Sequence, residues 1–87
     1  MTLRVYSKEN CPFCDRAKNL LRLKNIPFEE VRVDLDPAAK EFIVSKGHRT
    51  VPQIYLNEQL FVENGYNGLS QMTEAAFNQL KEQLNVN

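Results

Sequence analysis

The chain of 87 residues has the length of one small domain, and we expect a single domain over residues 1–87. Its 11 basic side chains balance its 11 acidic ones, which argues against a nucleic-acid binder, since such proteins carry a basic excess. No apolar run approaches the ~18 residues of a membrane span, and the first residues do not resemble a secretory signal. We therefore expect a cytoplasmic protein without a membrane or nucleic-acid partner.

The first part of the chain predicts strand, helix and strand in turn. Residues 3–6 alternate apolar and polar side chains, as a short strand does. Asn10 is a plausible N-cap, and Pro12 suits the first turn of a helix that apolar spacing extends to Lys24. Alternation returns at residues 28–34, which predicts the second strand.

The middle of the chain predicts a second helix and a hairpin. Asp36 before Pro37 repeats the cap-then-proline start, and Gly47 is expected to end this helix. Residues 51–56 predict a third strand and residues 59–62 a fourth, joined by a tight turn.

The last part predicts a loop bracketed by Gly65 and Gly68, followed by one amphipathic helix from Leu69 to Leu84. The expected order is therefore βαβαββα, an α/β domain with four strands and three helices. Because helices join the first three strands, we expect those strands to be parallel neighbours with right-handed crossovers.

The two cysteines, Cys11 and Cys14, lie in a C-P-F-C motif. A structural disulfide framework needs more cysteines and an oxidising compartment. A zinc site needs about four ligands, and His48 is the one histidine in the chain, so we expect no metal. Two inert, buried cysteines or a reversible dithiol remain, and a C-x-x-C motif beside a βαβ pattern favours the dithiol.

The start of a helix gives the two cysteines different roles. Free backbone N–H groups and the positive end of the helix dipole stabilise a thiolate at Cys11, which we expect to be the nucleophile. Residues 1–26 carry six basic and two acidic side chains, and Lys8, Arg16 and Lys18 are the available cations. Cys14, one turn further along, is expected to be the less exposed, resolving thiol.

Two features outside the C-P-F-C motif complete the candidate site. The Val51–Pro52 bond is either an ordinary trans bond at a strand start or a cis bond that presents the Val51 backbone to the sulfurs and to an incoming peptide. His48, in contrast, is expected to be an exposed loop residue, since a thiolate formed electrostatically needs no general base.

Together these motifs resemble those of a glutaredoxin. The resemblance rests on residues 5–8 before C-P-F-C, on R-T-V-P-Q-I-Y at residues 49–55 and on N-G-Y-N-G at residues 64–68. It implies a thioredoxin-like fold with a four-stranded mixed sheet, a cis peptide bond at Pro52, and a monomer that exchanges thiols and disulfides with glutathione. It further suggests disulfide-bearing protein substrates, ribonucleotide reductase among them.

The resemblance also implies a set of glutathione-binding residues: Lys8, Phe13, Arg49, Thr50, Val51, Pro52, Gly65, Tyr66 and Asn67. Lys8, with Arg49 as a further partner, would contact a carboxylate of glutathione, and the Val51 backbone would pair with its cysteinyl residue. Tyr66 and Asn67 would lie beside its γ-glutamyl end. Each of these side chains has a simpler alternative role in packing or solvation.

The match departs from the family at Gly68, where glutaredoxins carry an aspartate that helps to hold the γ-glutamyl amino group. The Gly-aromatic pair at residues 65–66 also resembles NrdH-type redoxins, which thioredoxin reductase reduces. That electron source is therefore the alternative function. A third, an iron–sulfur cluster carrier, is disfavoured because cluster-binding relatives have C-G-F-S or C-S-Y-C in place of C-P-F-C.

Overall fold

A computed structural model of the chain describes residues 1–85 and contains four strands and four helices. In chain order they are β1 (Leu3–Ser7), α1 (Pro12–Leu23), β2 (Glu29–Arg32), α2 (Pro37–Ser45), β3 (Gln53–Leu56), β4 (Gln59–Leu60), α3 (Gly65–Ser70) and α4 (Glu74–Gln83).

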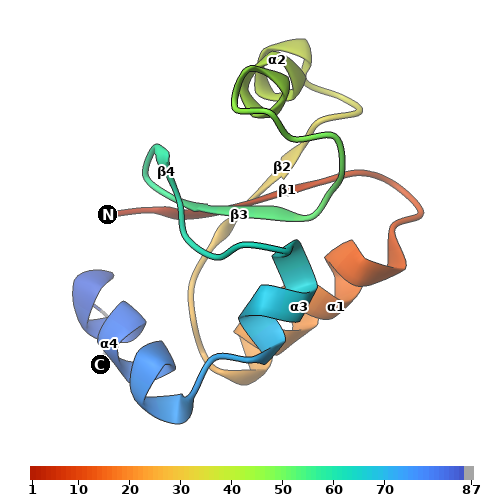
Figure 1. Cartoon of the computed structure of the whole chain (residues 1–87). Coiled ribbons are helices and arrows are strands. Elements are labelled where there is room, and N and C mark those ends of the chain that lie inside the picture. The colour runs from red at the N-terminus through yellow and green to blue at the C-terminus, as the bar shows by residue number, and fades with distance from the viewer. Residues whose placement is uncertain (86–87) are drawn as a thin grey trace.

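The four strands form one mixed sheet in the order β2-β1-β3-β4, with α2 on one face and α1, α3 and α4 on the other (Figure 1). Successive side chains along β1 and β3 point to opposite faces of the sheet, so these strands contribute to the core on both faces. Val5 and Ile54 pack against α1, α3 and α4, whereas Tyr6 and Tyr55 pack against α2. The central strands are therefore buried on both sides.

The direction of β3 differs from the expectation. β1 and β2 are parallel as predicted, but β3 runs antiparallel to β1, with Leu3 opposite Leu56 and Tyr6 opposite Gln53. A parallel β3 would require α2 to run back along the strands, to the edge of the sheet where β1 and β2 start. In Figure 1, α2 is instead seen nearly end-on while the strands run across the view. β3 therefore begins where β1 ends, which places residues 51–52 beside the start of α1.

The C-terminal part also differs from the expectation. The segment predicted as a loop forms α3, and the single helix predicted over residues 69–84 is interrupted between α3 and α4. The Thr73 hydroxyl accepts a hydrogen bond from the Ala76 N–H at 3.1 Å and caps α4, so the chain starts a new helix in a new direction. The order is βαβαββαα, with four helices instead of three.

Local signals predicted the starts of the first two helices well. Pro12 and Pro37 both lie in the first turn, and the Asp36 carboxylate caps α2. Asn10, however, is not the cap of α1: it has a left-handed backbone (φ 57°), and Cys11 is the N-cap.

Within the described residues, no helix combines the length and apolar character needed to cross a bilayer.

Candidate functional site

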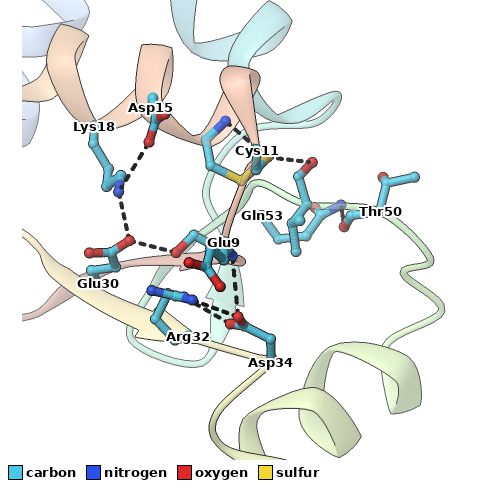
Figure 2. Close-up of a disulfide and its surroundings, with 12 residues drawn as sticks. Glu9, Cys11, Asp15, Lys18, Glu30, Arg32, Asp34, Thr50 and Gln53 are labelled. Atoms are coloured by element: carbon cyan, nitrogen blue, oxygen red, sulfur yellow. Dashed lines mark hydrogen bonds and ion pairs between the residues drawn. A yellow bond between two sulfur atoms is a disulfide. The ribbon is translucent and has the colours of Figure 1, made fainter.

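The two cysteines lie at the junction of β1 and α1 and form a disulfide (Figure 2). Cys11 has an extended backbone at the N-cap position, and its Sγ accepts a hydrogen bond from the Cys14 N–H at 3.2 Å. Cys11 is 7% exposed and Cys14 is fully buried at 0%. Both cysteines are therefore largely buried, and Cys11 is the more accessible of the two. This confirms the expected difference in exposure.

The Val51–Pro52 peptide bond lies opposite the disulfide and is cis, which confirms what the resemblance implied and decides between the two alternatives that the residues left open. The Val51 carbonyl oxygen is 3.9 Å from Cys11 Sγ. The side-chain amide of Gln53 donates a hydrogen bond to the Thr50 carbonyl at 2.9 Å, which holds the turn around the cis bond in place (Figure 2). A fixed backbone edge thus faces the reactive sulfur.

A cavity of about 510 Å³ extends from this edge toward α3. The predicted residues among its lining are Phe13, Thr50, Val51, Pro52, Gly65, Tyr66 and Asn67. Gly65 is essential to its shape: it has φ +52°, and a Cβ at this position would lie 2.5 Å from the Pro52 carbonyl oxygen. The loop before α3 therefore packs directly against the cis-proline turn.

Aromatic side chains form the outer wall of this cavity. Phe13 is 49% exposed and lies 6.2 Å from the ring of Tyr66, centroid to centroid. The Arg16 guanidinium stacks over Phe13 at 5.0 Å from the ring centroid. Arg16 therefore supports the wall of the groove, in addition to adding positive charge near the helix start.

A second cavity, of about 250 Å³, lies on the α2 side of the same edge. Its lining includes Lys8 and Arg49, the two residues expected to bind carboxylates, together with Lys40. Thr50 and Val51 line both cavities, so the two cavities are neighbours. The structure thus separates the predicted residues into a basic cavity and an aromatic and amide-rich one, on either side of Val51.

An ion pair fixes the loop that leads to Cys11 (Figure 2). Arg32 donates two hydrogen bonds to the Asp34 carboxylate, at 2.8 and 2.6 Å, and the Glu9 N–H donates a third at 3.3 Å. The Arg32 hydrogen bonds in particular lower the pKa of Asp34 to about 2. The carboxylate therefore stays charged at neutral pH and anchors the loop to the end of β2.

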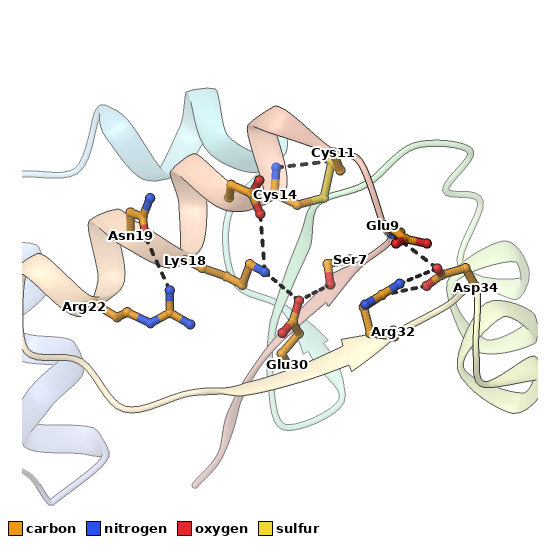
Figure 3. Close-up of polar contacts among 11 residues, drawn as sticks. Ser7, Glu9, Cys11, Cys14, Lys18, Asn19, Arg22, Glu30, Arg32 and Asp34 are labelled. Carbon is orange, nitrogen blue, oxygen red and sulfur yellow. Dashed lines mark hydrogen bonds and ion pairs between the residues drawn. A yellow bond between two sulfur atoms is a disulfide. The ribbon is translucent and has the colours of Figure 1, made fainter.

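A second polar cluster joins α1 to the sheet beneath the disulfide (Figure 3). The Lys18 ammonium and the Ser7 hydroxyl each donate a 2.7 Å hydrogen bond to Glu30 Oε2, and Lys18 lies 3.5 Å from Asp15. These hydrogen bonds, that of Lys18 first, lower the pKa of Glu30. Lys18 was one of the cations expected near the thiolate, and its ion pair with Glu30 also joins α1 to the sheet.

His48 also differs from the expectation of an exposed loop residue. It is half-buried, its Nε2 lies 2.6 Å from the Tyr55 hydroxyl, and it lines both cavities. Burial raises the pKa of Tyr55, so this phenol remains neutral and forms a hydrogen bond with the imidazole. His48 therefore joins the third strand to the wall of the groove.

The lining residues that the sequence analysis did not assign to the site include three polar ones: Lys40 in the smaller cavity, and Glu63 and Asn64 in the larger one. Lys40 lies on α2, and no motif around it in the sequence indicated that it would line a binding site. Glu63 and Asn64 directly precede the Gly-aromatic pair, and this adjacency was a usable signal. Among residues 1–85, no group of three or more His, Cys, Asp or Glu side chains is arranged to hold a metal ion.

Comparison with known proteins identifies relatives in sequence and in fold. The sequence matches the family model named Glutaredoxin over residues 3–61. Glutaredoxin 3 of Escherichia coli K12 is 41% identical over 58 residues, which cover 66% of this chain and 70% of that protein. The matched family segment contains both cysteines and the cis-proline turn and ends before residues 63–68.

Two solved structures show the similarity of fold. A buckwheat glutaredoxin–glutathione complex superposes with a TM-score of 0.69 at 21% identity, covering 95% of this chain and 76% of that one. The glutaredoxin-like NrdH-redoxin of Escherichia coli superposes with a TM-score of 0.65 at 24% identity, covering 84% and 100%. These similarities confirm the expected thioredoxin-like fold with a four-stranded mixed sheet.

Proposed function

This chain belongs to the glutaredoxin family and is a dithiol thiol–disulfide oxidoreductase, and from that premise we propose that glutathione is its reductant. One observation supports this above all others. The Val51 carbonyl, 3.9 Å from Cys11 Sγ, lies between a basic cavity and a polar aromatic one. A short peptide with a central thiol and charged ends matches that arrangement.

The proposed cycle starts with the reduced dithiol. The Cys11 thiolate attacks one sulfur of a substrate disulfide, forms a mixed disulfide, and releases the other substrate sulfur as a thiolate that takes a proton from water. Cys14 loses its proton and attacks Cys11 Sγ. The second substrate thiol leaves, and the Cys11–Cys14 disulfide seen in the structure forms.

Two molecules of glutathione restore the dithiol. The first attacks Cys11 Sγ as a thiolate, and Cys14 leaves and is protonated. The second attacks the glutathione sulfur of the mixed disulfide, which releases glutathione disulfide and the Cys11 thiolate. The Cys14 N–H hydrogen bond to Cys11 Sγ stabilises the sulfur as a leaving group and as a nucleophile. The sum is one disulfide reduced for two glutathione thiols oxidised.

The binding of glutathione follows from the two cavities. Lys8 and Arg49 would hold its glycyl carboxylate in the basic cavity, and the backbone at Thr50, Val51 and Pro52 would pair with its cysteinyl residue. The residues assigned to the γ-glutamyl end in the larger cavity are Phe13, Gly65, Tyr66 and Asn67.

The proposal extends to the setting of the reaction. We place the protein in the cytoplasm, where glutathione keeps thiols reduced, and as a monomer that meets folded substrates through the exposed face around Cys11. Its substrates would be disulfide-bearing proteins, ribonucleotide reductase among them, and mixed disulfides with glutathione.

Reduction by thioredoxin reductase is the second candidate, and it rests on one observation. Gly68 supplies no carboxylate at the position where the family has an aspartate. The test measures the rate at which the oxidised protein is reduced by glutathione and, separately, by NADPH with thioredoxin reductase, with Cys11→Ser as the inactive control. Faster reduction by glutathione at cellular concentrations supports the proposal. Reduction by the reductase alone would refute it and leave the dithiol chemistry intact.

A further inference from the structure

The two cavities beside Val51 carry opposite charge. The larger one has a single acidic side chain in its lining, Glu63, and no lysine or arginine. The smaller one is lined by Lys8, Lys40 and Arg49, and its one acidic residue, Asp34, is neutralised by an ion pair. A ligand that spans Val51 therefore meets negative charge at one end and positive charge at the other.

Glu63 takes up the space beside Gly68. A Cβ on Gly68 would overlap the Glu63 carbonyl oxygen and would lie 3.4 Å from the Val62 Cβ. The carbonyl group of Glu63 thus occupies the position where a side chain at residue 68 would begin, and Glu63 itself lines the larger cavity. The acidic residue of this cavity is therefore residue 63, and residue 68 has no side chain.

The Glu63 carboxylate is available for a ligand. Glu63 is exposed, and no lysine or arginine among residues 1–85 lies within ion-pair distance of it. Asn64 follows with a left-handed backbone (φ 63°), which turns the chain directly into the buried Gly65 at the cis-proline turn. The carboxylate therefore lies on a short, sharply turned segment that packs against the backbone edge facing Cys11.

We propose that Glu63 binds the ammonium group at the γ-glutamyl end of glutathione and so sets the specificity of the larger cavity. This inference rests on glutathione being the reductant. Glutathione has a carboxylate alone at its glycyl end, and an ammonium with a carboxylate at its γ-glutamyl end. The basic cavity suits the first end, whereas Glu63, with the amides of Asn64 and Asn67, suits the second.

The test compares glutathione with its des-amino analogue, glutaryl-cysteinyl-glycine, as reductants of the oxidised protein. An exposed ion pair changes an equilibrium by about two- to fivefold, so the wild-type protein should show a kcat/KM about two- to fivefold higher for glutathione. Glu63→Gln should reduce this preference to about one, and Glu63→Lys should reverse it. Glu58→Gln, an exposed acid in the β3–β4 turn, is the matched control and should keep the preference.

The comparison of two peptides in each variant cancels differences in thiol reactivity between the peptides, as a double-mutant cycle does. If Glu63→Gln keeps the wild-type preference while glutathione reduces both proteins, the role of Glu63 is refuted and glutathione remains the reductant. If neither peptide reduces the wild-type protein while thioredoxin reductase does, the proposed function itself is refuted, and the role of Glu63 with it.

Discussion

Gly65 and Gly47 form a matched pair that tests how the groove is built. Both have a left-handed backbone, with φ +52° and +88°, but a Cβ on Gly65 would lie 2.5 Å from the Pro52 carbonyl oxygen, whereas a Cβ on Gly47 would meet nothing within 4 Å. Gly65→Ala therefore adds a steric overlap to a backbone strain, and Gly47→Ala adds the strain alone.

The expected cost of each substitution follows from these two terms. A left-handed backbone costs an L-residue roughly 1–2 kcal/mol, and this term is common to both variants. The overlap at Gly65 forces a backbone shift of the kind that costs roughly 1–3 kcal/mol in a packed interior. Gly65→Ala should therefore lose about 1–3 kcal/mol more in the free energy of unfolding than Gly47→Ala, because the gain from a less flexible unfolded chain is the same in both.

Urea denaturation followed by far-ultraviolet circular dichroism measures this difference. A lower midpoint at unchanged slope reports a loss of stability, and the difference corresponds to a shift in Tm of about 4–8 °C per kcal/mol for a domain of this size. The shift of Pro52 should also raise the KM for glutathione in Gly65→Ala alone. Equal stability of the two variants, within about 0.5 kcal/mol, would refute the close approach of the loop to the cis-proline turn.

Three further predictions concern the dithiol, the loop and the anchor. Cys14→Ser should still reduce mixed disulfides of glutathione but lose the reduction of protein disulfides, and equal loss of both activities in coupled assays would contradict its resolving role. Gly68→Asp, which introduces the usual family residue, should lower the urea midpoint without lowering the KM for glutathione, because its Cβ overlaps the Glu63 carbonyl. The ion pair with Arg32 lowers the pKa of Asp34 from 3.8 to about 2, so the stability it contributes is present above pH 4 and lost as the pH falls toward 2. Asp34→Asn should abolish that part of the acid transition, as measured by Tm against pH.

Features that depend on neighbouring residues were predictable from the sequence. Asp36 before Pro37 starts α2 as expected, since an N-cap and a first-turn proline act within one turn of helix. The slightly greater exposure of Cys11 than of Cys14 follows from the same local rule, because Cys11 is the cap and Cys14 lies one turn into the helix. The dithiol pair was therefore predictable before the fold was known.

Features that depend on distant segments were not predictable in this way. Apolar spacing continues across residues 69–84, so the spacing did not show the break between α3 and α4, whose buried side chains join one core cluster with the sheet. The ion pair of Lys18 was missed for the same reason, because its partner Glu30 comes from a strand that local sequence does not place beside α1.

The sequence by itself determined the chemistry, a dithiol at a helix start with a proline turn to face it, because caps, prolines and cysteine spacing act over a few residues. The tertiary structure decided the direction of β3, which carries Val51 to within 3.9 Å of Cys11 Sγ. It also decided the charge on each side of that contact, with Lys8, Lys40 and Arg49 in one cavity and Glu63 in the other. Those positions arise from contacts between segments far apart in the chain, where burial and backbone hydrogen bonding override local preference.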